Sequence, residues 1–185
     1  MDERELKKLE RRLRNALTSG NAETYNALDT IRKQEDPDPK RYTYFDKVDL
    51  SGLVLDGFIF ERIVFTDLKL DNTIFKNNVV FHDAEIRDSV FDGCRFDGTF
   101  NDVGFWSCTF STYRFEGITF RKTSFISSTV GARTRFIGCR LSGLREVASS
   151  SWEEVILDSA KQRDILCRKM QQKIRVERPR HKKNK

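Results

Sequence analysis

The chain has 185 residues, of which 34% are charged and 38% are apolar, and it carries a formal net charge of +6 at pH 7. This length suits one domain with terminal extensions, and the composition alone would be close to that of a disordered protein. The amino terminus begins with charged residues, and no apolar run approaches the ~20 residues that a membrane span needs. We therefore expect a cytoplasmic protein with no signal peptide and no membrane partner.

Residues 1–34 are predicted to form a helical hairpin. Leucines at helical spacing mark a buried stripe on residues 2–18, at Leu6, Leu9, Leu13 and Leu17. Gly20 suits the end of this helix, and Asn21 suits the cap of the next. Residues 36–39 (DPDP) end the second helix, because proline disfavours helix in the residue before it. Residues 35–47 are therefore predicted to be a connector.

An apolar residue, usually phenylalanine, recurs about every five residues from Leu50 to Leu141. Thirteen of the fifteen phenylalanines stand at these positions. The nineteen positions are Leu50, Leu55, Phe60, Phe65, Leu70, Phe75, Phe81, Ile86, Phe91, Phe96, Phe100, Phe105, Phe110, Phe115, Phe120, Phe125, Val130, Phe136 and Leu141. A short fixed period is typical of a solenoid, in which each repeat buries its apolar residue against its neighbours. Residues 48–144 are therefore predicted to form a solenoid.

The units of this block resemble those of the pentapeptide-repeat family. In that family a large apolar residue is preceded, two positions earlier, by a small or apolar one. Residues 89–93 (SVFDG), 94–98 (CRFDG) and 108–112 (CTFST) match this pattern. The resemblance implies a right-handed, four-sided β-helix with four units per coil. The expected fold is thus an all-β solenoid of nearly five coils, with a helical hairpin before it and an amphipathic helix after it.

Grouping the units by four supports the four-sided shape. Two positions after every fourth apolar centre stand Gly57, Asn77, Gly98, Gly117 and Gly138, which suit a corner with positive φ. The same grouping predicts one interior stack of Phe60, Phe81, Phe100, Phe120 and Leu141 and another of Leu55, Phe75, Phe96, Phe115 and Phe136. At ~4.8 Å per coil the solenoid is roughly 24 Å long. The unequal steps at residues 75–81 and 96–100 predict bulges that leave the stacks intact.

Both flanks of the solenoid are expected to cover apolar surface. The N-terminal hairpin is expected to cover the outward apolar residues of the early coils, which are Val54, Ile59, Val64, Ile74 and Val80. Residues 151–154 (SWEE) match a capping box and indicate a helix over residues 145–176. Trp152, Met170 and Ile174 on this helix are candidate partner-binding residues. The helix either closes the last coil or pairs with a second copy in a homodimer.

Two features of the solenoid walls are candidates for partner binding. Arg95, Arg114 and Arg135 are predicted to stack on one wall as a ladder that suits phosphates or carboxylates. Alternatively, Asp97 and Glu116 neutralise this ladder. Trp106 is predicted to point outward with Ile126 one coil later, which is typical of a binding hot spot. Alternatively, the C-terminal helix lies across them.

The C-terminal segment carries the excess positive charge. Residues 145–185 hold 12 basic and 6 acidic residues. Residues 177–185 are expected to be a basic tail without fixed structure. The candidate nucleic-acid contacts are Lys173, Arg175, Arg178, Arg180, Lys182, Lys183 and Lys185, which suit a phosphate backbone. The alternative is a solvated charged end.

No catalytic motif stands out in the chain. His82 and His181 have no partner at a motif spacing, and neither a phosphate-binding loop nor a dinucleotide motif is present. Three of the four cysteines, Cys94, Cys108 and Cys139, stand two residues before a repeat centre, where a small packing residue fits. We therefore expect no enzyme, no cofactor and no metal site.

The expected function is a non-enzymatic scaffold that docks a protein partner through its walls and terminal helices. The first alternative is nucleic-acid binding through the basic C-terminal segment. The second follows from the family resemblance, because its best-known branch mimics DNA toward bacterial topoisomerases such as gyrase through a strongly acidic rod. Here residues 49–102 hold 5 basic and 11 acidic residues, whereas residues 103–144 hold 6 and 1. This division into an acidic and a basic half departs from that pattern.

Overall fold

The computed structural model describes residues 3–36, 38, 40–111, 113–131, 134–148, 150–152, 155–157 and 159–177. The backbone alone is described for residues 77, 78, 97, 116, 148 and 171–177. The helices are α1 (Glu3–Thr18), α2 (Ala22–Glu35) and α3 (Ala160–Glu177). The strands are β1 (Thr43–Asp46), β2 (Val54–Asp56), β3 (Ile59–Thr66), β4 (Ile74–Arg87), β5 (Val90–Asp92), β6 (Arg95–Trp106), β7 (Thr109–Ser111), β8 (Arg114–Glu116), β9 (Thr119–Ile126), β10 (Thr129–Val130), β11 (Arg135–Ile137), β12 (Arg140–Ala148), β13 (Ser151–Trp152) and β14 (Ile156–Leu157).

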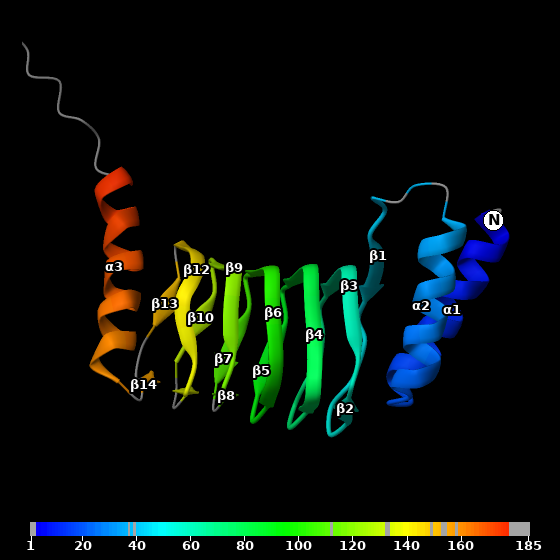
Figure 1. Ribbon diagram of the computed structural model, residues 1–185, viewed down its shortest axis with the longest axis horizontal. Coiled ribbons are helices and arrows are strands. Elements are labelled where there is room, and N and C mark those ends of the chain that lie inside the picture. Colours follow the sequence, from blue (N-terminus) through cyan, green and yellow to red (C-terminus); the bar gives the residue numbers. More distant parts are fainter. Residues whose placement is uncertain are drawn as a thin grey trace, which may run out of the picture.

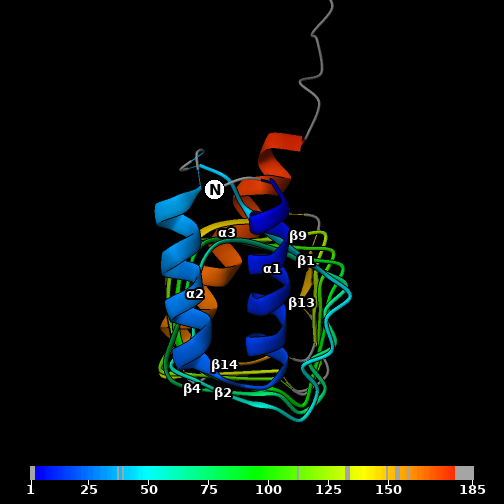
Figure 2. The same ribbon diagram turned by 90° about the vertical axis from the view of Figure 1, so that its right-hand side faces the viewer.

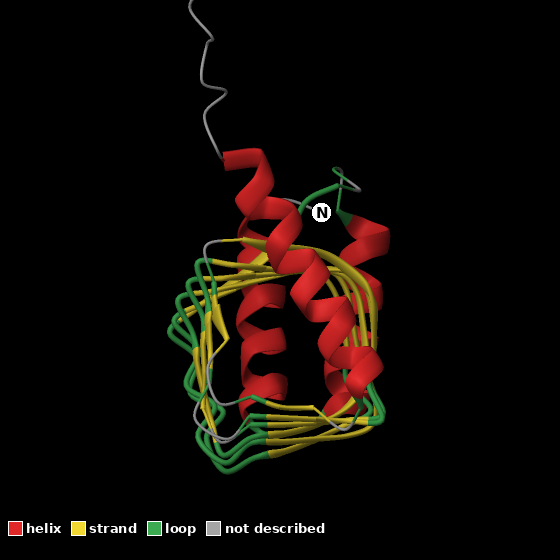
Figure 3. Ribbon diagram, turned by 90° about the vertical axis from the view of Figure 1, so that its left-hand side faces the viewer, coloured by secondary structure: helices red, strands yellow, loops and turns green. Residues whose placement is uncertain are grey.

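The strands wind into a four-sided parallel β-helix of about five turns, which Figures 2 and 3 show end-on. We name its walls A to D in chain order by the inward residues that stack along each. Wall A holds Phe45, Phe65, Ile86, Phe105, Phe125 and Val147; wall B holds Leu50, Leu70, Phe91, Phe110, Val130 and Trp152; wall C holds Leu55, Phe75, Phe96, Phe115, Phe136 and Leu157; wall D holds Phe60, Phe81, Phe100, Phe120 and Leu141. The predicted solenoid fold and both predicted stacks are confirmed.

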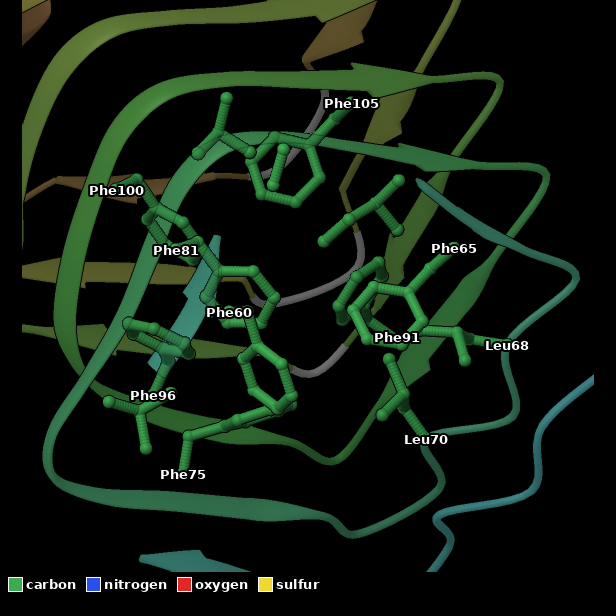
Figure 4. Close-up of a cluster of buried hydrophobic side chains, with 14 of the residues drawn as sticks. Phe60, Phe65, Leu68, Leu70, Phe75, Phe81, Phe91, Phe96, Phe100 and Phe105 are labelled. Atoms are coloured by element: carbon green, nitrogen blue, oxygen red, sulfur yellow. The ribbon is translucent and has the colours of Figure 1, made fainter. Parts of the chain in front are cut away.

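Aromatic rings fill the interior of the coils (Figure 4). On wall D the ring centroids of Phe60 and Phe81 lie 4.7 Å apart, and on wall B those of Phe91 and Phe110 lie 4.5 Å apart. These separations fall in the range where paired rings attract each other beyond the area that they bury. Each ring is buried only because the next coil covers it, so the period of the sequence and the stability of the fold have one physical origin.

The solenoid is longer at both ends than the sequence prediction. β1 lies in the predicted connector and pairs Phe45 with Phe65 of β3. At the other end, β13 and β14 continue the walls beyond residue 144. The predicted helix over residues 145–176 is therefore wrong in its first part, because α3 begins at Ala160. Trp152 is an inward strand residue whose ring lies 5.4 Å from that of Phe136. Packing of this half-buried indole against the last coil outweighs the capping-box pattern.

The corners use left-handed backbone more widely than predicted. Gly57, Gly117 and Gly138 have φ of 70°, 68° and 63°, as expected for a corner column. Asn77 and Gly98, however, lie inside strands β4 and β6. A Cβ on Gly98 would lie 2.1 Å from the carbonyl oxygen of Val79, where a bulge shifts the register. Glycine is required there because two backbones approach closely, not because the chain turns.

The helices close the two open ends of the solenoid (Figure 1). Tyr25 of α2 is buried against Phe58 and Phe60 of the first coil. The expectation that the hairpin covers the outward apolar residues is wrong for Val54 and Ile59, which remain 45% exposed, whereas Val64 is buried and Ile74 and Val80 are half-buried. The hairpin packs on the open end of the solenoid instead of its outer walls, because the open end presents both unpaired backbone groups and interior rings.

Side-chain amides from the helices bond the outermost backbone groups. Asn26 of α2 donates to the carbonyl oxygen of Gly57 at 3.0 Å and accepts from the amide of Ile59 at 3.0 Å. At the other end the buried Gln162 of α3 donates to the carbonyl oxygen of Cys139 at 2.9 Å. α2 and α3 thus supply hydrogen bonds that a further coil would have made.

Candidate protein-docking site

The corner between walls D and A, here the D–A corner, is polar along its whole length. Arg62, Asp83, Asp102 and Lys122 occupy it in successive coils, with φ between 49° and 56°. Aspartate is among the non-glycine residues that adopt this left-handed conformation more readily, whereas arginine and lysine do so less often. The corner therefore places two carboxylates in adjacent rungs between two cations.

A notch of about 320 Å³ lies beside this corner, and we call it the Trp106 notch. Its lining comes from β4, β6, β9, β12 and the segment before β1. The lining residues are Tyr42, Asp83, Ala84, Glu85, Asp102, Val103, Gly104, Trp106, Lys122, Ser124, Ile126, Arg145 and Glu146. The notch therefore joins four coils, and no single repeat unit contains it.

Trp106 provides the apolar part of the notch. Its side chain is on the outer surface of wall A, in register with Arg87 on one side and Ile126 on the other. Trp106 is 40% exposed, and α3 packs on β12 and β14 instead. The indole folds back over Gly104, where a Cβ would lie only 2.6 Å from its Nε1 atom. The absence of a side chain at residue 104 thus lets the ring lie against the wall.

Acidic groups outnumber basic groups around this ring. The Tyr42 hydroxyl donates to Asp83 at 2.5 Å, and this bond, with burial, raises the pKa of Tyr42 to about 12. Glu85 accepts a hydrogen bond from Arg87. Asp102 lies 3.8 Å from Lys122 Nζ and 3.8 Å from Arg145.

Only part of the notch was visible in the sequence. The repeat pattern identifies Trp106 and Ile126 as outward neighbours, and the register places them side by side. Tyr42 was missed because it precedes the first predicted unit. Asp83 and Asp102 were missed because each stands two residues after a repeat centre, where no binding role was predicted. Grouping these positions by four would have placed them in one column.

The arginine ladder is in register on wall C. Arg95 pairs with Arg114, and Arg114 pairs with Arg135, so the three side chains lie on adjacent rungs and are exposed. The side chains of Asp97 and Glu116 are outside the described part of the structure, so their predicted neutralising role stays a prediction. The ladder is bounded by Ile74 before it and Ile156 after it.

The C-terminal candidates do not form one surface in the described residues. Trp152 lies inside the solenoid, and Met170 is partly buried against the core. For Lys173, Ile174 and Arg175 the structure describes only the helical backbone. The remaining tail candidates, Arg178, Arg180, Lys182, Lys183 and Lys185, lie outside the described residues.

Two of the buried thiols of the solenoid, those of Cys94 and Cys108, are held protonated. Cys94, Cys108 and Cys139 are free and buried, whereas Cys167 on α3 is exposed. Burial raises the pKa of both Cys94 and Cys108 to about 12. Within the described chain, no three His, Cys, Asp or Glu residues gather as metal ligands. No described helix is long and apolar enough to span a membrane.

Five-residue units that form successive walls of a four-sided parallel β-helix define the class of pentapeptide-repeat β-helices, and this chain has that architecture. No family model matches the chain, and no curated protein matches it. It is similar to the crystal structure of a pentapeptide repeat protein (Rfr23) from the cyanobacterium Cyanothece 51142, with 8% identity and a TM-score of 0.45, over 72% of this chain and 96% of that chain. It is also similar to a trypsin-treated QnrB1, a plasmid-mediated fluoroquinolone resistance protein, with 14% identity and a TM-score of 0.19, over 68% of this chain and 86% of that chain. The chain's own strand register defines its fold.

Proposed function

We propose that this chain is a non-enzymatic interaction scaffold that docks a protein partner on walls D and A, with Trp106 as the anchor. The observation that carries the proposal is the exposed indole, held over Gly104 in a notch on a repeat wall. Exposed tryptophans in pockets with a polar rim are typical anchors of protein interfaces. A rigid wall adds to this, because a partner then loses little free energy in ordering the site.

The closed ends of the solenoid support the same proposal. α1, α2 and α3 cover the first and last coils, so a partner is not needed to shield the interior rings. The long walls are the surfaces left for binding. Wall A carries the notch, and wall C carries the arginine ladder.

The proposal is tested by affinity purification from the source cells with full-length wild type and two variants. Trp106→Ala removes the anchor, and Val90→Ala removes a 48% exposed residue on wall B as the matched control. We expect a partner that is retained by wild type and by Val90→Ala, and at least tenfold depleted with Trp106→Ala. A partner retained equally by both variants would contradict docking at the notch.

A further inference from the structure

We propose that the Trp106 notch binds an arginine side chain presented by a basic segment of the protein partner. This inference rests on the proposed function, since it names the chemistry of the partner that docks at the same notch. The charge of the lining, the contacts of Asp102 and the placement of the indole carry it.

The lining of the notch favours a cation. Four carboxylates line it, those of Asp83, Glu85, Asp102 and Glu146, against the two cations Lys122 and Arg145, and Arg87 beside the notch pairs with Glu85. The acidic half of the solenoid supplies three of the carboxylates, and the later coils supply both cations. A partner with phosphates or carboxylates would face repulsion from this lining, whereas a basic segment would complete it.

Asp102 has ion pairs that are open to exchange. Its two cationic neighbours each lie at 3.8 Å, well beyond the ~2.8 Å of a charge-assisted hydrogen bond. The side chains of Lys122 and Arg145 are 71% and 68% exposed, so solvent screens both pairs. An incoming guanidinium can replace them with two parallel N–H···O bonds to this one carboxylate.

The indole selects arginine over lysine. Gly104 lies between Trp106 and Asp102 in the chain, and the indole folds toward it, so ring and carboxylate border the same space. A guanidinium is planar and weakly hydrated, which lets it stack on the ring while its edge bonds the carboxylate. A lysine ammonium has no plane to stack and makes no fork of donors.

The test uses the fluorescence of Trp106 in full-length protein that carries Trp152→Phe. Trp106 and Trp152 are the only two tryptophans. The buried Nε1 atom of Trp152 has no hydrogen-bond partner among the described residues, so phenylalanine removes an unsatisfied donor and keeps the ring stacked on Phe136. The probes are four: a Gly/Ser peptide with three arginines, the same peptide with three lysines, the same with three glutamates, and a short DNA duplex.

Three substitutions in this background probe the three observations. Asp102→Asn keeps a residue that tolerates left-handed backbone and should lower the affinity for the arginine peptide about threefold to tenfold. Lys122→Asn removes a competing cation and should strengthen binding about twofold or more. Gly104→Ala displaces the indole and should weaken binding about tenfold. Circular dichroism checks that each variant stays folded.

We expect saturable quenching by the arginine peptide, weaker quenching by the lysine peptide, and a loss of affinity as salt rises. Equal binding of the glutamate peptide, or quenching by DNA alone, would overturn the inference. So would an arginine response that Asp102→Asn and Lys122→Asn leave unchanged. If a native partner depends on Trp106 but not on Asp102 or Lys122, the arginine inference fails while the docking proposal stands.

Discussion

Glycine has two separate roles in this solenoid, and they have different costs of substitution. Gly57 turns a corner with a φ of 70°, and no atom lies within 4 Å of the place that a Cβ would take. Gly98 and Gly143 instead sit beside bulges, where a Cβ would lie 2.1 Å from the carbonyl oxygen of Val79 and 1.9 Å from that of Phe120. The first role concerns backbone conformation, and the second concerns the spacing between coils.

Gly98→Ala is therefore expected to lower the free energy of unfolding by about 3 kcal/mol or more, since the backbone of a neighbouring coil must move. Gly57→Ala introduces only the strain of left-handed backbone and should lower the free energy of unfolding by about 1 kcal/mol. Urea unfolding followed by circular dichroism measures both values. Equal losses in the two variants would show that the bulge tolerates a wider spacing between coils.

The cysteine thiols also differ in their surroundings, since three are buried in the solenoid and one is exposed on α3. With a pKa of about 12, roughly one in 10,000 of the Cys94 and Cys108 thiols is a thiolate at pH 8, and both are buried. A disulfide reagent at pH 8 should therefore modify Cys167 rapidly and the three solenoid thiols only after unfolding. Cys167→Ser should remove the rapid phase. A second rapid phase in native protein would mean that a coil opens.

At the scale of elements, the terminal helices substitute for missing coils. The Asn26 amide donates to one backbone group of the first coil and accepts from another, as a neighbouring strand would. The buried Arg32 forms an ion pair with the Asp29 carboxylate at 2.8 Å. Lys33 pairs with both Asp29 and Glu61 of β3, and so connects α2 to the first coil. The hairpin is thus held by both side-chain packing and edge hydrogen bonds.

Asn26→Ala is expected to lower the free energy of unfolding by about 1–3 kcal/mol, because it leaves two backbone groups of the sheet edge without partners. Asn15→Ala on the exposed surface of α1 is the matched control and should stay within about 0.5 kcal/mol of wild type. Thermal unfolding of both variants compares them. Similar melting temperatures would indicate that water replaces the Asn26 amide at no cost.

The sequence revealed the elements that depend on the five-residue period and missed those that depend on its ends. The walls and stacks were predictable because each Phe repeats the same local environment. Phe45, Val147, Trp152 and Leu157 continue the period, but a connector and a capping box were favoured there instead. The notch could be predicted only in part, since the pairing of Tyr42 with Asp83 depends on how the connector crosses the corner.

At the scale of the whole molecule, each coil is stabilised by its neighbours, so the last coil and its helix determine whether the solenoid is complete. A chain that ends at residue 144 would lack the inward Val147, Trp152 and Leu157 as well as α3. Phe125 and Phe136 would then lose the indole that contacts both of them. β11 would also lose its partner β14, and the end of β9 would lose residues 146–148 of β12.

We therefore expect the chain that ends at residue 144 to aggregate or to lose cooperative unfolding, because it exposes interior rings and a strand edge together. The control is a chain that ends at Glu177, which keeps every strand and helix of the structure. This control should melt within about 2 °C of the full chain, since a domain of this size shifts by about 2–4 °C per kcal/mol. Light scattering measures the aggregation of both chains, and calorimetry measures the cooperativity and temperature of their unfolding. A monomeric, cooperatively folding 1–144 chain would show that the first four coils are stable without the last coil and α3.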